Sequence, residues 1–113
     1  MNTQTPQAET RVRRAALLQA AFSAIRDRPE TATRDELNLA LRAEFRVLLP
    51  IVQTQMEAIT PRTRDWYARD MAIHAANEEL ARGLSPSPLA AYLTLAELGR
   101  RLHVLDVLAG GGS

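Results

Sequence analysis

The most constraining feature of the chain is a row of apolar residues that repeats at helical spacing and passes through a proline. The row advances in steps of 4, 4, 3, 4, 4 and 3 residues and comprises Leu37, Leu41, Phe45, Leu48, Val52, Met56 and Ile59. This is the spacing of the buried seam of a helical bundle. Because the row keeps its register across Pro50, we predict one kinked helix over residues 35–59 rather than two short helices.

The proline lies in the interior of this predicted helix, where it removes one backbone hydrogen bond at a cost of about 3 kcal/mol. A bend at Pro50 would let the long helix wrap its shorter neighbours, which is a common role of a proline kink. The alternative is that the bend opens a pocket between helices. Leu49 and Pro50 would line this pocket, with Tyr92, His74 or His103 as its polar groups.

Three further segments have helical spacing, and none shows the alternation of apolar and polar residues that a half-buried strand requires. They span about residues 10–27, 61–82 and 88–109. Since short connections favour antiparallel neighbours, we predict an all-α fold, an antiparallel up-down four-helix bundle with a kinked second helix. The predicted buried stripes are Val12, Ala15, Leu18, Phe22 and Ile25 in the first helix, and Trp66, Ile73, Leu80 and Leu84, flanked by Ala76, in the third.

Residues with capping side chains mark the helix starts. Thr33 is the expected cap of the second helix, because Glu36 stands three places later and can reach back to the capping amide. Thr60 is the expected cap of the third helix, with Pro61 in its first turn. Ser87, which precedes another proline, is the expected cap of the fourth.

The composition fits one domain over residues 10–109, with flexible tails at 1–9 and at the glycine-rich end, 110–113. Hydrophobic residues make up 46% and charged residues 24%, as in soluble globular proteins. The absence of cysteine excludes disulfides, thiolate metal sites and cysteine nucleophiles. The net charge of +1 offers no general attraction for nucleic acid or a membrane, and no segment resembles a secretion signal or a membrane span. We expect a soluble, cytoplasmic protein.

Catalytic and metal-binding motifs are not evident in the sequence. The chain has no lysine for a phosphate-binding loop and no serine in a nucleophile elbow. His74 and Glu78 stand one turn apart and could ligate one metal ion, but two ligands do not make a site. A basic recognition helix for nucleic acid is also missing. We therefore predict no catalytic residue, no metal, no cofactor and no nucleic-acid partner.

The third predicted helix carries a second, amphipathic strip on the side opposite its buried stripe. The strip consists of Tyr67, Met71, His74 and Glu78, at i, i+4, i+7 and i+11. Tyr and Met are favoured at protein contacts, which makes this strip a candidate partner-binding surface. The alternative is that these are ordinary surface residues around a small core.

The last predicted helix is apolar on nearly every side. A helix of this kind is either central in the fold or covered by a partner subunit. Asp106 lies on the side of Leu95 and Leu102, where a carboxylate would be costly if buried alone, so we expect His103 or an arginine to neutralise it, or the end of the helix to be frayed in water. The apolar residues are Leu89, Leu93, Leu95, Leu98, Leu102, Val104, Leu105 and Leu108.

Three segments, LRAEFRVLLPIV, RDWYARDMAIHAANEELARG and SPSPLAAYLTLAELGRRLHVLDVL, resemble the small helical proteins of actinobacteria that share a domain of unknown function and are often labelled natural-product biosynthesis proteins. The resemblance covers about residues 12–108. Leu48, Leu49 and Pro50 match the leucine and proline segment of that family, while Ile51 stands where the family usually has an acidic residue. The resemblance implies a helical fold and transfers no catalytic residue.

Three functions follow as hypotheses. The first is a non-enzymatic accessory or regulatory module that contacts a protein partner or itself, expected as a homodimer, in an actinobacterial natural-product or regulatory system. The second is a small-molecule-binding or catalytic bundle with its pocket at the Pro50 kink. The third is a transcriptional regulator, which would bind DNA with a steep dependence on salt.

Overall fold

The computed structural model describes residues 6–110, and every regular element in that part of the chain is an α-helix. The all-α prediction is therefore confirmed. Helix α1 begins at Pro6, so residues 6–9, which the sequence assigned to a flexible tail, are helical; residues 1–5 and 111–113 of the predicted tails lie outside the described part. The four helices are α1 (Pro6–Asp27), α2 (Thr31–Glu57), α3 (Arg64–Ala81) and α4 (Pro88–Leu108).

Helix α2 runs without interruption through Pro50, as the apolar row indicated. A bend at the proline remains a prediction. The predicted start of this helix is wrong, because the cap is Glu30 rather than Thr33. The amide of Arg34 already donates to the carbonyl of Glu30 at 2.8 Å, so the helical ladder closes before Thr33 could act as a cap.

The predicted cap of α3 is also wrong by three residues. Arg62 has a φ of +68°, a left-handed conformation that no helix can contain, so α3 cannot begin at Pro61. The cap is Thr63, whose Oγ1 accepts a hydrogen bond from the amide of Trp66 and donates one to the carbonyl of Thr60. Ser87 stands at the cap of α4 as predicted, without a side-chain bond to the helix.

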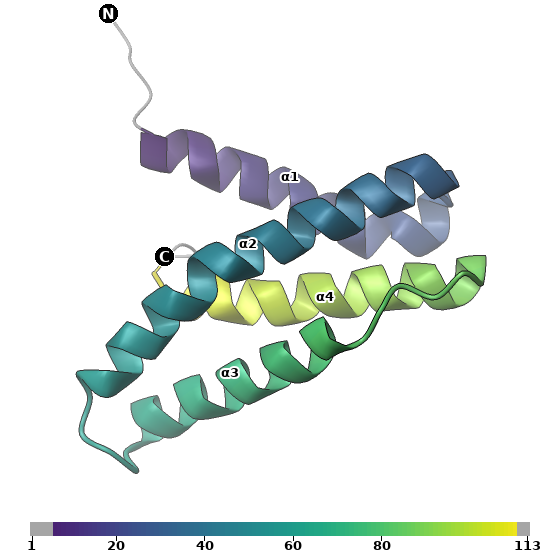
Figure 1. Ribbon diagram of the computed structural model, residues 1–113. Coiled ribbons are helices and arrows are strands. Elements are labelled where there is room, and N and C mark those ends of the chain that lie inside the picture. The colour runs from purple at the N-terminus through teal and green to yellow at the C-terminus, as the bar shows by residue number, and fades with distance from the viewer. Residues whose placement is uncertain (1–5, 111–113) are drawn as a thin grey trace, which may run out of the picture.

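Helices α2 and α4 form the middle of the molecule, and each contacts all three other helices. Helices α1 and α3 lie on either side and, within residues 6–110, do not contact each other. Following the colours of Figure 1, α1 and α3 run one way across the view and α2 and α4 the other. The molecule measures 45 × 44 × 19 Å, and a thickness of 19 Å corresponds to about two helices of 10 Å each.

The core is built where α2 and α4 face each other. The predicted seam of α2 is buried from Leu37 to Val52, whereas Met56 and Ile59 are half-buried. Leucines of α4 complete the core, namely Leu95, Leu98, Leu102 and Leu105. The predicted seam is thus confirmed from Leu37 to Val52.

The predicted stripe of α1 is wrong in most of its members. Val12, Ala15, Phe22 and Ile25 are exposed. The buried side is formed by Leu18, the one member predicted correctly, and by small residues such as Ala21 and Ala24. The reason is a close approach between α1 and α4. A Cβ added at Gly99 would lie 2.9 Å from the Cβ of Ala21, so these helices meet through small residues and their larger neighbours stay outside.

The predicted stripe of α3 is confirmed in part, because Ile73, Leu80 and Leu84 pack against the core and Ala76 is buried. Trp66, Ile73, Leu80 and the following Leu84 are only half-buried, while Ala72, Ala76 and Glu79 are the buried residues of this helix. No helix in residues 6–110 has the length and hydropathy needed to cross a membrane.

Candidate interaction surface

Helix α4 is central in the fold and still exposes an apolar side. Leu89, Leu93, Val104 and Val107 are between 42% and 61% exposed, although α4 packs on every other helix. Residues at these spacings lie on one side of a helix, the side turned away from the buried leucines. We call this surface the α4 face and define it as Leu89, Leu93, Ala96, Glu97, Arg100, His103, Val104 and Val107.

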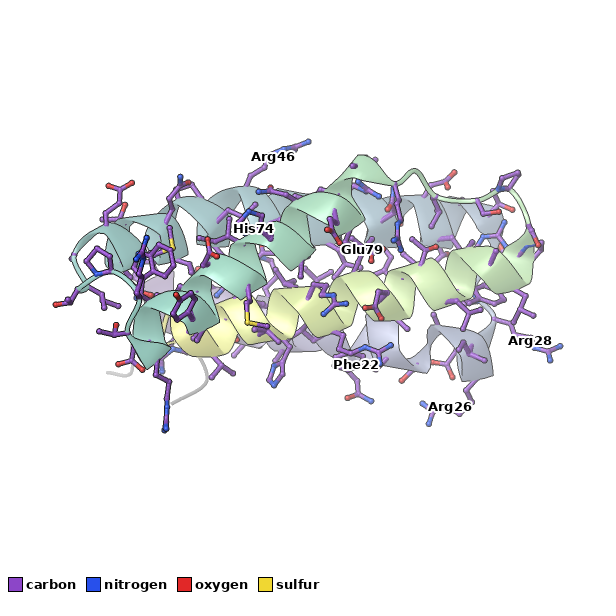
Figure 2. The ribbon with its side chains drawn as sticks, turned by 90° about the horizontal axis from the view of Figure 1, so that it is seen from below. Phe22, Arg26, Arg28, Arg46, His74 and Glu79 are labelled. Carbon is purple, nitrogen blue, oxygen red and sulfur yellow. The ribbon has the colours of Figure 1, made fainter. Side chains whose placement is uncertain are left out.

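The α4 face continues onto the two outer helices. In Figure 2, α4 crosses the view between α3, which carries His74, and α1, which carries Phe22. Phe22 is 47% exposed, yet its ring edge reaches Gly99 of α4. On the other side Met71 of α3 is 69% exposed. Together these side chains make an apolar strip that spans three helices, and contiguous patches of this kind mark interaction sites more often than single exposed residues do.

A hollow lies on each side of α4 along this surface. The hollow between α3 and α4 has a volume of about 300 Å³, and the one between α1 and α4 about 420 Å³. Both are lined mainly by apolar or small side chains, which suits the insertion of apolar side chains from a partner. The linings are Ala68, Met71, Ala72, Ala75, Arg101 and Val104 in the first hollow, and Ile25, Arg28, Pro88, Leu89 and Tyr92 in the second.

The charges on the α4 face are of both signs and sit at its centre. Glu97 accepts from Arg100 at 2.8 Å and from Arg101 at 3.0 Å. Arg101 Nε is the one buried side-chain nitrogen or oxygen in the described residues that lacks a hydrogen-bond partner. The two ends of the face, around Leu93 and Val107, are apolar.

The predicted partner strip on α3 is exposed in all four members, but it lies at the edge of this surface. Met71 alone among them lines the hollow beside α4. Tyr67 packs edge-on against Trp66 at 5.2 Å, and His74 bonds to the carbonyl of Asp70 at 2.8 Å, while Glu78 is in solvent. The sequence reasoning missed the α4 face, for which the leucines on every side of the last helix were the available signal.

The predicted pocket at the kink is not assembled as one site. Tyr92 donates a hydrogen bond to the carbonyl of Pro29 at 3.2 Å, and its ring lies under Arg34, near the start of α2. Pro50 is 50 − 34 = 16 residues further along the same helix, or about 24 Å at 1.5 Å per residue. Tyr92 and the Pro50 region are therefore separate parts of the molecule. Leu49, beside Pro50, is half-buried and packs against the core.

Near the other end of α4, a buried ion network joins three helices. Arg14 of α1 is 6% exposed and donates from Nε to Glu44 of α2 at 2.7 Å and from Nη1 to Asp106 of α4 at 2.9 Å. Burial by itself lowers the pKa of Arg14, but its hydrogen bonds to the two carboxylates and their charges outweigh burial, so the pKa is raised above the ordinary arginine value. Of the alternatives that the sequence left open for Asp106, namely His103, an arginine or a frayed helix end, the structure shows an arginine.

A third hollow, of about 350 Å³, adjoins this network. Arg14 and Asp106 form part of its wall, and Val47 and Ile51 of α2 form the apolar part. This is the cavity nearest to Pro50 in sequence, although neither Leu49 nor Pro50 lines it. In residues 6–110 no three His, Cys, Asp or Glu side chains lie close enough to hold a metal ion.

Comparisons of the whole chain with protein-family models, with curated proteins and with solved structures give no match.

Proposed function

We propose that this protein is a non-enzymatic interaction module that forms a homodimer through the α4 face. One observation carries the proposal: the helix at the centre of the fold exposes Leu89, Leu93, Val104 and Val107 along one side. A helix that is apolar all round in a single chain is expected to be covered on its remaining side. Exposed Phe22 and Met71 extend the area that a partner would cover.

A second copy of the chain is the occupant that the charges favour. Glu97 already accepts from Arg100 and Arg101 of its own chain. A twofold-related copy would bring a second opposite charge to Glu97 and to Arg100 and extend this pair into a network across the contact. The whole chain has a net charge of +1, which sets up little long-range repulsion between copies.

The setting of this activity follows from the family resemblance of the sequence. We place the module in the cytoplasm, as an accessory or regulatory component of an actinobacterial natural-product system. As its scaffold we propose an antiparallel up-down bundle in which a bend at Pro50 lets α2 follow the shorter helices.

The test is the replacement of an exposed leucine on the α4 face by a charged residue. In Leu93→Glu an unpaired carboxylate would be buried at the dimer contact, and we expect the dissociation constant to rise by about 100-fold or more. Leu39→Glu is the matched control, because Leu39 is 66% exposed on α2, away from this surface. Light scattering after size exclusion should show dimers for the native chain and Leu39→Glu and monomers for Leu93→Glu; equal masses for all three would refute the proposal.

A second candidate function is the binding of a small molecule in the hollow beside Arg14 and Asp106. Its size and mixed apolar and charged lining favour it. It ranks below the first because the charges of Arg14, Glu44 and Asp106 are already paired with one another, which leaves no unpaired charge for a ligand.

A further inference from the structure

We infer that two copies pair antiparallel along α4, with Glu97 and Arg100 setting the register across the twofold axis. This inference rests on the proposed function and adds the orientation, which self-association alone leaves open. We start from the spacing of six residues of the α4 face, namely Leu89, Leu93, Ala96, Arg100, His103 and Val107; all are exposed except half-buried Ala96, and exposed Val104 lies beside them. Their steps are 4, 3, 4, 3 and 4, the spacing of a coiled-coil seam.

The seam is symmetric about residue 98. Its members fall into pairs whose numbers add to 196, namely 89 with 107, 93 with 103 and 96 with 100. In an antiparallel pair centred at this position, Leu89 therefore meets Val107 of the second copy, and Leu93 meets His103 with Val104 beside it. The seam runs from Leu89 to Val107, 18 residue steps or about 27 Å along the helix axis.

The charges at the centre select between the two orientations. In an antiparallel pair, the offset along the helix axis between Arg100 and Glu97 of the second copy is about one residue. The offset between Arg100 and Arg100 of the second copy is about four residues. In a parallel pair, Arg100 would face its own equivalent, which places two guanidinium charges together. The small side chain of Ala96 leaves room for Arg100 of the second copy.

The flanking side chains agree with this arrangement. Phe22 of α1 lies beside Gly99 of α4, and Met71 of α3 lines the hollow between α3 and α4. A twofold axis through the centre of the α4 face therefore places each outer helix of one copy beside the second copy. Each hollow beside α4 is then available to apolar side chains of the partner.

The experiment uses disulfide trapping in the full chain, which has no cysteine of its own. Leu89→Cys and Val107→Cys are made singly, and one of the two chains carries a tag that separates mixed dimers by mass. Both residues are exposed, so the substitutions leave the core intact. After mixing, subunit exchange and mild oxidation, we expect the mixed disulfide to exceed either self-linked product by about tenfold, because a disulfide requires Cα atoms within about 7 Å.

The control is Leu39→Cys, which should remain unlinked. Efficient self-linking of L89C and of V107C, with no mixed product, would overturn the antiparallel pairing while the dimer proposal survived. Dimers by sedimentation without any disulfide at residues 89 or 107 would exclude α4 as the contact and overturn both proposals. Monomers throughout would refute self-association itself.

Discussion

Arg14 is the residue that ties α1 to both central helices. It is placed among Glu44 and Asp106 with almost no access to water, and it leaves neither carboxylate alone. Replacing all members of such a buried ion group by apolar residues can leave the free energy of unfolding unchanged. Removing one member is costly, because the remaining charges stay buried without a partner. The network therefore makes the position of α1 depend on a single side chain.

The first prediction concerns the loss of this cation. We expect Arg14→Met to lower the free energy of unfolding by about 3 to 5 kcal/mol, since Glu44 stays buried without its partner. Urea unfolding measures the change, and Arg13→Met at the exposed neighbouring position should change stability by less than about 0.5 kcal/mol. The double variant R14M/E44Q should regain part of the loss; no recovery would show that the charge is not its cause.

The loss of stability in Arg14→Met should depend on pH in a defined direction. In the native chain the raised pKa of Arg14 keeps the cation, so its contribution is complete below the unfolded value and is lost only at strongly alkaline pH. Arg14→Met lacks this contribution at every pH. Its stability deficit should therefore stay constant through the neutral range and shrink only at strongly alkaline pH, as followed by urea unfolding at each pH. A deficit that grows on acidification would contradict this explanation.

The sequence identified Asp106 as a carboxylate in need of a partner, but it could not identify Arg14. Arg14 and Asp106 are 92 residues apart, and the chain holds fourteen arginines. The choice among them depends on how α1 rotates about its axis when it packs, which local spacing does not determine.

At the scale of the elements, the rotation of α1 is set by its close approach to α4. Gly99 allows the backbones to come together, and Phe22 closes over the contact from the outside. The apolar spacing of α1 correctly predicted a helix, but it predicted the wrong buried side. The buried side consists largely of alanines, which contribute little to a hydropathy pattern. The seam of α2 could be predicted because its large side chains outnumber such small ones.

Gly99→Ala tests this contact. The added methyl group meets Ala21 Cβ at 2.9 Å, and the resulting strain costs about 1 to 3 kcal/mol, against a gain of about 1 kcal/mol in helix propensity. The difference predicts a net loss of stability of up to about 2 kcal/mol by urea unfolding. Gly83→Ala is the control, since no atom lies within 4 Å of the added carbon. A Gly99→Ala chain that is about 1 kcal/mol more stable than the native one would show the full gain in helix propensity, and so would show that the helices separate at no cost.

At the scale of the whole molecule, α4 is the central helix that its sequence allowed, and its coverage by a partner subunit stays a prediction. It is central, and it has a side that no other helix in residues 6–110 covers. The α3 strip predicted from the sequence lies beside this surface because Met71 borders the hollow next to α4. Which side of α4 stays uncovered depends on the packing of three other helices, and so the α4 face emerges only from the folded arrangement.

The molecular mass of the native chain in solution tests the central claim most directly. One chain has a mass of 12.5 kDa, so a homodimer has 2 × 12.5 = 25.0 kDa. Sedimentation equilibrium over a range of concentrations should give the dimer mass and a monomer that appears only on dilution. A mass of one chain at every concentration would contradict the assignment of the α4 face as a contact between copies.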